Sequence, residues 1–473
     1  MAVSEADFRA RARKALDDDN LQAALAQAKG GFVDKRADAI LDLPAFEQLR
    51  ERGRQIKDHT LEYLDTYLDE FEQNLNSAGG QLHYAADAES AREAVLRICR
   101  EAHARQIIKA KTMAGEEVGL NEALEAEFET VESDLGEYII QLAKEPPSHI
   151  IAPAVHKTRG EITELFDTHH HGRSGGPLRE TPDLVNEARG VLREKFLGAD
   201  IGISGANFLV ADTGTITLVT NEGNADLSTS LPRVHIAIAG VEKLVPSMQE
   251  ASSMLRLLAR SATGQQITAY TTFITGARRE DELDGPEELH VVLIDNGRSR
   301  MLGNDYREML RCIRCGACMN HCPVYSAIGG HAYGWVYPGP MGAVLTPMFR
   351  GLDKSSDLPQ ACTLNGRCQT VCPVKIRLPH LIRQLRDDAF EQQITPATTR
   401  WGIRGWAWLA RRPRLYTAVT GLAQRLMSRL GRGSVRRAPL AGAWTAGRDL
   451  PLPGRGGTFQ QQWQARQRSG QDG

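Results

Sequence analysis

A cysteine-rich segment in the C-terminal third constrains this chain most strongly. It reads CIRCGACMNHCPVY, and its cysteines follow the spacing C-x2-C-x2-C-x3-C-P at Cys312, Cys315, Cys318 and Cys322. Thiolate is a soft ligand that suits iron bridged by sulfide, and this is the spacing of bacterial iron-sulfur sites. In such sites the fourth cysteine binds the other cluster of a pair, so the motif predicts a second copy.

The second copy reads CTLNGRCQTVCPVKI and lacks one thiol. Aligned on Cys-Pro, it has Cys362, Cys368 and Cys372 at motif positions one, three and four, and Asn365 at position two. The crossing rule predicts a first 4Fe-4S cluster on Cys312, Cys315, Cys318 and Cys372, and a second cluster on Cys322, Cys362 and Cys368. The second cluster is expected to be 3Fe-4S, or 4Fe-4S with the Asn365 oxygen, a water or a partner's group as its weak fourth ligand. Alternatively, Asn365 only caps the loop, and another residue completes the cluster.

Zinc and a disulfide framework are the alternatives for these cysteines. Structural zinc sites usually pair two C-x2-C units across a longer gap, whereas here a proline follows a compact cysteine run twice. Disulfide frameworks belong to secreted chains, and the N-terminus MAVSEADFRARARKALDDDN has no apolar signal region. We therefore expect a cytoplasmic iron-sulfur protein, in which the remaining Cys99 is a small core residue.

The length and the patterning predict four segments. At 473 residues, 41% hydrophobic and 25% charged, the chain has the composition of a globular protein of about three domains. We expect a helical segment over 1–60, an α/β domain over 61–300, a helical two-cluster iron-sulfur domain over 301–390 and a basic tail over 391–473. Helical periodicity persists to about residue 105, and β-branched runs follow. Strands are expected at QIIKAKTM, TVES, SHIIAPAV, HIAIAG and VVLIDN, with a hairpin joined at Asp212–Gly214.

The run from about 60 to 300 resembles a known family. The segments KAKTM, ESDLGEYI, ISGANFLVADTGTI, TNEGN and HIAIAGVEKLVPS look like the lactate-utilisation domain, and the fusion to a two-cluster unit resembles the lactate-utilisation iron-sulfur proteins. The resemblance implies a domain similar in fold to ribose-5-phosphate isomerase and coenzyme A transferases. It also implies an electron-transfer subunit of an NAD-independent complex that oxidises L-lactate to pyruvate. The implied partners are a cysteine-rich subunit and a second lactate-utilisation-domain subunit.

Two other functions are open at this point. A cluster-dependent lyase would use an open iron on this chain for catalysis, and a redox sensor would use the clusters without an enzymatic reaction. No glycine-rich fingerprint for a nucleotide has the required spacing, so we expect neither NAD nor ATP.

Polar residues of the α/β domain suggest an active site only weakly, and no catalytic residue is assigned. Residues at strand ends could present an anion site, although turn chemistry is the favoured explanation; they are Asn207, Thr213, Gly214, Thr215, Asn221 and Glu222. Lys109 and Lys111 could pair with a carboxylate, but the solvent face of an edge strand is the commoner setting. His169, His170 and His171 suit a metal by type, and a loop is the favoured alternative.

The tail from Arg400 differs from the rest in charge. It holds 14 arginines, no lysine and two aspartates, a charge of about +12, so the remainder of this chain of net charge −2 is near −14. Most of the tryptophans are here too: Trp401, Trp406, Trp408, Trp444 and Trp463. Arginine with tryptophan suits a partner interface or an anionic membrane. We expect partner docking first, membrane contact second and no nucleic acid. The segment 447–473 is expected to be extended or disordered when alone.

Overall fold

The computed structural model describes residues 8–170, 178–429, 433–435, 448–453 and 456–469. The chain divides into two compact units, residues 1–389 and 390–473, which are described separately. In the described part of the chain, no helix is both long enough and apolar enough to cross a membrane.

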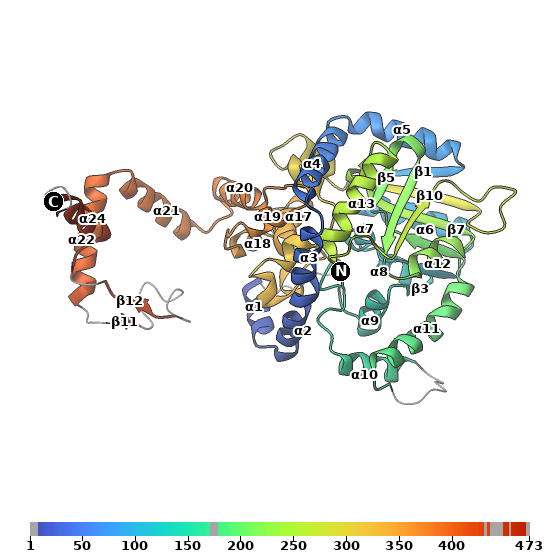
Figure 1. Cartoon of the computed structure of the whole chain (residues 1–473), viewed down its shortest axis with the longest axis horizontal. Helices are drawn as coiled ribbons and strands as arrows, with labels where there is room; N and C mark the ends of the chain where they lie inside the picture. Colours follow the sequence, from blue (N-terminus) through green and yellow to red (C-terminus); the bar gives the residue numbers. More distant parts are fainter. Residues whose placement is uncertain (1–7, 171–177, 430–432, 436–447, 454–455, 470–473) are drawn as a thin grey trace. The chain divides into compact units, whose positions relative to one another are not determined.

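Helices form the N-terminal part of the first unit (Figure 1). They are α1 (Phe8–Leu16), α2 (Asp19–Lys29), α3 (Lys35–Leu41), α4 (Phe46–Glu62) and α5 (Leu64–Ser77). The expectation that helices continue to about residue 105 was wrong at one place, because strand β1 (Gly80–Ala85) separates α5 from α6 (Ala88–Glu101). β1 is an edge strand that pairs only with a strand from far along the sequence, so local periodicity did not show it.

A six-stranded parallel sheet is the centre of the α/β domain. Its strand order is β1-β10-β7-β4-β2-β3, and every neighbouring pair is parallel. The other strands are β2 (Gln106–Lys109), β3 (Glu129–Glu132), β4 (Ile201–Ser204), β7 (Val234–Gly240) and β10 (Glu288–Ile294). These results confirm the strands predicted at TVES, HIAIAG and VVLIDN. The strand predicted at QIIKAKTM is confirmed over QIIK only, because β2 ends at Lys109.

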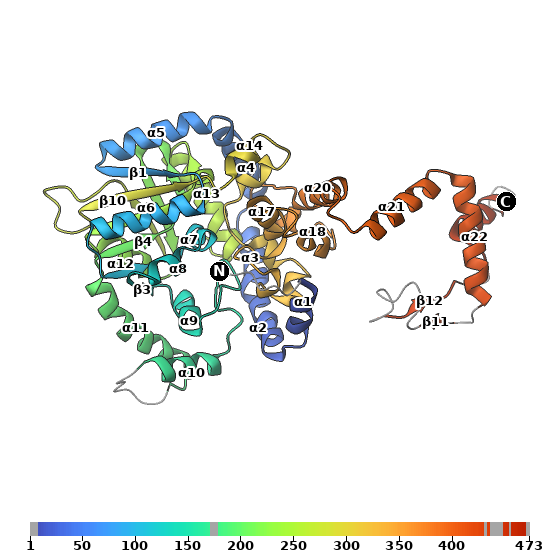
Figure 2. The ribbon, with the colours of Figure 1, turned by 180° about the vertical axis from the view of Figure 1, so that it is seen from behind.

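Both faces of this sheet are covered, as a parallel sheet requires. Alternate residues of β10 point to opposite faces: Val292 packs in a core with α6, α7 (Met113–Val118) and α8 (Leu120–Glu125), and Val291 in a core with α5. Figure 2 shows α6 in front of the sheet, and Figure 1 shows β5 of the second sheet in front of the other face. Near β2 and β3 lie α9 (Leu135–Ala143), α10 (Arg159–His169) and α11 (Thr181–Gly198).

A smaller sheet has the order β8-β5-β6-β9. Its strands are β5 (Phe208–Val210), β6 (Thr215–Thr220), β8 (Leu244–Val245) and β9 (Tyr270–Ile274). The predicted hairpin at Asp212–Gly214 is confirmed, since β5 and β6 are antiparallel. Gly214 has φ 64°, and a Cβ there would lie 2.3 Å from the Leu75 backbone nitrogen, so the turn needs glycine for both reasons.

The predicted strand SHIIAPAV is wrong. Residues 148–155 form turns and bends, not a strand. The His149 imidazole accepts the N–H of Ile151 at 2.9 Å, and Tyr325 of the iron-sulfur segment donates its hydroxyl to the Ser148 carbonyl at 2.9 Å. The apolar run is therefore buried against another segment and not within a sheet.

Every regular element between residues 301 and 390 is helical. After α14 (Arg298–Leu302) come the 3-10 helix η4 (Arg307–Arg311), α15 (Ala317–Asn320), α16 (Tyr325–Ile328), the 3-10 helix η5 (His331–Tyr333), α17 (Gly339–Arg350), α18 (Asp357–Ala361), α19 (Arg367–Val371) and α20 (Leu378–Glu391). Their buried side chains share one core with Phe46 and Ile56 of α4 and with Met254 of α13 (Met248–Ala262). The N-terminal helices and the iron-sulfur segment therefore stabilise each other.

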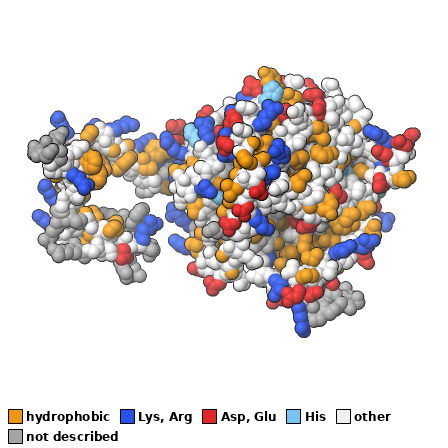
Figure 3. Space-filling view, viewed as in Figure 1, with side chains coloured by type: hydrophobic (Ala, Val, Ile, Leu, Met, Phe, Trp, Pro, Cys, Tyr) orange, Lys and Arg blue, Asp and Glu red, His pale blue; other side chains and the backbone are white. Residues whose placement is uncertain are grey.

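The second unit is helical and exposes its aromatic residues. It contains α21 (Ala397–Ala410), α22 (Pro413–Arg429), a short antiparallel pair β11 (Ser434–Val435) and β12 (Leu450–Pro451), and α24 (Phe459–Ser469). The segment 447–473 was expected to be extended or disordered, and this is wrong where α24 forms. Trp401 is 70% exposed, and Figure 3 shows hydrophobic side chains beside arginines on this unit. Trp444 lies outside the described residues.

Candidate iron-sulfur centre and adjoining cavity

The two cysteine motifs fold into the same local backbone. Arg314 (φ 58°) and Leu364 (φ 55°) occupy the same motif position, and Gly316 (φ 72°) and Gly366 (φ 83°) follow two residues later. A non-glycine residue with positive φ is uncommon, so its repetition at one motif position indicates a shared loop geometry. In both copies a short helix follows, α15 in the first and α19 in the second.

The cysteines gather in two neighbouring groups. Cys312, Cys315, Cys318 and Cys372 line one small cavity, so the last cysteine of the second motif joins the first three of the first motif. The other three cysteines also lie close together. Burial raises the pKa of Cys368 most, and the charges of Cys362 and then Cys322 raise it further. These are the same two sets that the crossing rule groups.

The surroundings of these thiols suit a cluster. Burial, before any other cause, raises the pKa of Cys315 and Cys368 to about 12 and that of Cys372 to about 11, so thiolates here require the positive charge of bound iron. Backbone N–H groups already point at sulfur: Ile376 donates to Cys372 Sγ and Leu364 to Cys362 Sγ, both at 3.3 Å.

A cubane also fits the spread of the cysteines. Within the described ranges, no three His, Cys, Asp or Glu side chains converge on one metal ion. A cubane needs no such convergence, because each thiolate binds a separate iron. The residues present therefore fit iron-sulfur clusters.

Asn365 occupies the loop position that Cys315 has in the first motif, but in a different environment. Cys315 is buried, whereas Asn365 is exposed. The Asn365 Oδ1 atom accepts the backbone N–H of Arg367 at 3.0 Å. This contact is the loop cap that was one of the alternatives for Asn365. The second cysteine group lacks a thiol at this position, and the position lies at the protein surface.

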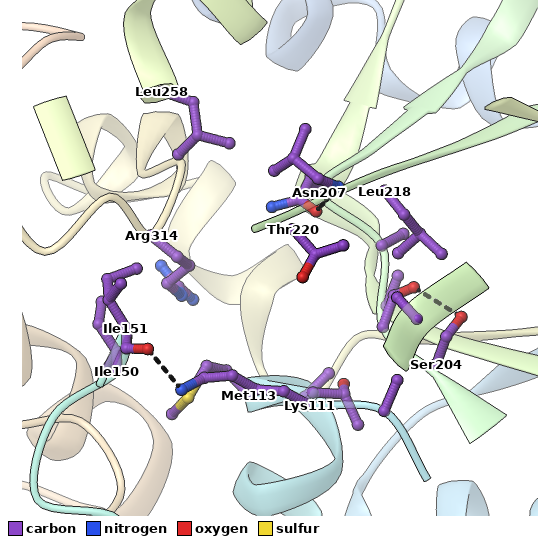
Figure 4. Close-up of a pocket in the computed structure, with 18 of the residues that line it drawn as sticks. Lys111, Met113, Ile150, Ile151, Ser204, Asn207, Leu218, Thr220, Leu258 and Arg314 are labelled. Atoms are coloured by element: carbon purple, nitrogen blue, oxygen red, sulfur yellow. Dashed lines mark hydrogen bonds between the residues drawn. The ribbon is translucent and has the colours of Figure 1, made fainter. Parts of the chain in front are cut away.

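A cavity of about 300 Å³ adjoins the first cysteine group (Figure 4). It lies beyond the carboxyl ends of β2, β4 and β7, the edge at which open α/β sheets bind ligands. Arg314, from the loop between Cys312 and Cys315, and Tyr337 form its wall on the iron-sulfur side. In Figure 4, Arg314 faces Asn207 and Thr220 across the cavity.

The polar residues predicted at the strand ends fall into two groups, because some line the cavity and others do not. Asn207, Asn221 and Glu222 line the cavity. Two of these amides are also structural, because Asn207 Oδ1 accepts the N–H of Val219 at 2.9 Å and Asn221 Oδ1 that of Ala269 at 3.0 Å. Thr213, Gly214 and Thr215 do not line it. Thr213 and Gly214 lie in the turn between β5 and β6, which confirms the turn explanation for them, whereas Thr215 is the first residue of β6.

The edge-strand setting expected for the two lysines was wrong. β2 lies between β3 and β4 in the sheet, and Lys109 is fully buried with its Nζ 2.7 Å from the Glu132 carboxylate. Lys111 lines the cavity, donates to the Ile151 carbonyl at 3.1 Å and lies 3.5 Å from Glu137. Both lysines therefore pair with carboxylates.

The loop expected for the adjacent histidines was also wrong where the structure describes it. His169 is the last residue of α10, and His170 is buried. The His170 ring hydrogen-bonds the Tyr138 hydroxyl at 2.9 Å and lies 3.2 Å from Glu187. His171 lies outside the described residues.

A buried charge network beside the cavity was missed by sequence reasoning. Arg298 contacts Glu117 at 2.8 Å and Glu242 at 2.5 Å, and Arg314 contacts Glu242 at 3.2 Å. Tyr337 donates its hydroxyl to Glu117 at 2.7 Å. These residues come from four distant parts of the chain. The only sequence signal was the segment HIAIAGVEKLVPS, which contains Glu242 and Lys243.

The cysteine Cys99 is separate from both sites. It is fully buried in the core beside α6, as expected, and burial raises the pKa of its thiol to about 12.

Comparisons with known proteins agree with this arrangement. Residues 68–294 match the LUD domain and residues 308–376 the 4Fe-4S dicluster domain. Lactate utilization protein B of Oceanobacillus iheyensis is 42% identical over 98% of this chain and 97% of its own. That of Bacillus pumilus is 43% identical over 96% of each. The "Uncharacterized electron transport protein YkgF" of Escherichia coli is 41% identical over 95% of this chain and 94% of its own.

One solved structure, a DUF162 family protein from Deinococcus radiodurans, aligns with 49% of this chain and 98% of its own at 16% identity. Its TM-score of 0.26 is too low to support an argument. The sequence relatives confirm the resemblance over nearly the whole length: the chain belongs to the lactate utilization protein B family, with a LUD domain joined to a domain for iron-sulfur clusters.

Proposed function

We propose that this chain is the iron-sulfur electron-transfer subunit of a complex that oxidises L-lactate to pyruvate. The observation that carries the proposal is the arrangement of the cysteines. Two groups lie side by side in one core, since the charge of Cys368 in the second group also raises the pKa of Cys318 in the first. Adjacent clusters pass electrons between partners. The name of the Oceanobacillus iheyensis relative gives lactate, and that of the Escherichia coli relative gives electron transport.

We assign the first cluster, as 4Fe-4S, to Cys312, Cys315, Cys318 and Cys372, and the second to Cys322, Cys362 and Cys368. When bound, the clusters accept and release one electron at a time. Five of the seven cysteines are buried away from water, and backbone N–H groups point at the sulfur atoms of Cys362 and Cys372. Both effects set the reduction potential.

For the second cluster we propose the 3Fe-4S form in the isolated protein. The amide of Asn365 binds iron poorly compared with thiolate, and its oxygen already accepts the Arg367 N–H. The exposed corner also favours one alternative, in which an open iron on this chain takes part in catalysis as in a lyase. The ligand count of the second cluster distinguishes the two functions.

We further propose that the complex contains a cysteine-rich subunit and a second LUD-domain subunit. The second unit of this chain supports partner docking because its arginines stand beside exposed aromatic side chains such as Trp406 and Trp408. An anionic membrane surface is the second choice. For the LUD domain we propose the fold of ribose-5-phosphate isomerase and coenzyme A transferases, which the parallel sheet supports.

The test is lactate-dependent reduction of the clusters. The chain is co-expressed with its two partner subunits, purified without oxygen and mixed with L-lactate, and cluster reduction is followed by absorbance and electron paramagnetic resonance. We expect reduction in the complex and none in Cys315→Ser, which removes a ligand of the first cluster. The control Cys99→Ser changes a thiol far from both groups and should behave like the wild type. Clusters that stay oxidised in a fully loaded wild-type complex would contradict the proposal.

A further inference from the structure

We propose that the cavity beside the first cysteine group binds a small monocarboxylate, with Lys243 and Arg314 holding its carboxylate. The identity of this acid as a 2-hydroxy or 2-oxo acid rests on the proposed function. The binding site itself rests on the charges, the lining and the position of the cavity.

The first observation is a cation without a partner. Lys243, in the 3-10 helix η3 (Val241–Lys243), lines the cavity. In the described part of the chain its amine makes no hydrogen bond and no ion pair within 4 Å, while the neighbouring carboxylate of Glu242 is already engaged by Arg298 and Arg314. A cation that faces a protein cavity gains most from an anionic ligand.

The second observation is the position of Arg314. Its guanidinium lies over the Tyr337 ring at 4.9 Å and 3.2 Å from Glu242, which fixes its direction. It lines the same cavity as Lys243. Burial, and then the positive charge of Arg314, lower the pKa of Lys243 to about 8. Two cations this close to each other repel, and a carboxylate between them relieves that repulsion.

The rest of the lining selects a small ligand with one charge. Ile150, Leu218 and Leu258 supply apolar surface, and Thr220 supplies a hydroxyl on the side opposite Arg314 (Figure 4). Besides Glu242, two further carboxylates line the cavity, Asp134 and Glu222. Asp134 caps α9 by accepting the N–H of Gly136 at 3.0 Å. The pKa of Glu222 is raised by burial and then by Asp134. These groups disfavour a ligand with a second negative charge, so a monocarboxylate fits better than a dicarboxylate or a phosphate.

The third observation is the closeness of the first cysteine group. Arg314 stands between Cys312 and Cys315 in the sequence, and the charge of Cys312 is among those that act on Lys243. A carboxylate bound between Lys243 and Arg314 therefore lies one side-chain layer from the ligands of the first cluster. This places the LUD cavity where electrons would enter the cluster.

The experiment measures binding and not turnover. Full-length protein with reconstituted clusters is titrated, without oxygen, with propionate, pyruvate and L-lactate in a calorimeter. Losing a charged hydrogen-bond partner should weaken binding roughly 10- to 100-fold in Lys243→Gln. Lys243→Arg should retain most of the affinity. Lys354→Gln, which changes an exposed lysine of the iron-sulfur segment, is the matched control and should bind as the wild type does.

A second measurement needs no variant. Propionamide, the neutral analogue of propionate, should bind the wild type at least about 10-fold more weakly than propionate. Equal binding of the acid and the amide, or unchanged affinity in Lys243→Gln, overturns the site. Tighter binding of inorganic phosphate than of propionate overturns the monocarboxylate assignment. Monocarboxylate binding that persists while lactate fails to reduce the clusters of the complex would remove the proposed function and leave this site standing.

Discussion

Replacing Arg298 with Gln tests how the cavity and the iron-sulfur segment are held together. Arg298 is 2% exposed and joins Glu117 of α7 to Glu242 of η3. Tyr337 and Arg314 of the iron-sulfur segment contact the same two carboxylates. Removing the guanidinium would leave both carboxylates buried with too little positive charge.

The size of the effect follows from Glu242. Burial alone would raise its pKa, but Arg298, followed by Arg314 and Lys243, lowers it from 4.5 to about 2. One pKa unit corresponds to about 1.4 kcal/mol, so the ionised carboxylate gains about 3 kcal/mol from its surroundings. This agrees with the roughly 3–5 kcal/mol lost when one partner of a buried ion pair is removed. For a large domain, each kcal/mol of lost stability lowers the melting temperature by roughly 2 °C. We therefore expect Arg298→Gln to melt about 5–10 °C lower than the wild type at pH 7.

The pH dependence gives a second check. In the wild type the folded pKa of Glu242 is depressed, so its stabilisation is present above about pH 4.5 and is lost as the pH falls towards about 2. In the variant, burial without Arg298 should raise the pKa of Glu117 and Glu242 above 4.5. The folded variant then binds extra protons, and its deficit relative to the wild type should shrink on going from pH 8 to pH 6.

The assay is thermal unfolding at one scan rate, without oxygen, for wild type, Arg298→Gln and the exposed control Arg300→Gln. Arg300→Gln should melt within about 1 °C of the wild type. A loss below about 2 °C in Arg298→Gln, or a deficit that grows on acidification, would refute the idea that this network stabilises the fold.

Two further predictions concern the second cluster and the tail. Asn365→Cys adds the missing thiolate; we expect a three-iron signal in the oxidised wild type that disappears in the variant, and two ordinary four-iron clusters in both proteins would contradict this. Deleting residues 400–473 should leave the iron and sulfide content unchanged but release a partner subunit, with the wild-type association weakening as salt rises. Full co-purification of the truncated chain would show that this tail has another role.

The spacing of the cysteines determined the local structure of the iron-sulfur segment. Three ligands within seven residues must lie on one tight loop, so the repeated motif was enough to predict two matching loops, and Arg314 and Leu364 show the shared backbone. Alternating β-branched runs and amphipathic helices likewise predicted the α/β domain. These features depend on contacts between near neighbours in the sequence, which a pattern can show.

Tertiary structure alone decided the cavity and its charges. Glu117 and Arg298 are 181 residues apart, and Arg314 and Glu242 are 72 apart, so no local pattern could pair them. Lys109 is buried because its strand became internal in the sheet, and SHIIAPAV stayed out of the sheet because the iron-sulfur segment covers it. Burial depends on which distant segment packs against a residue, and that is a property of the folded chain as a whole.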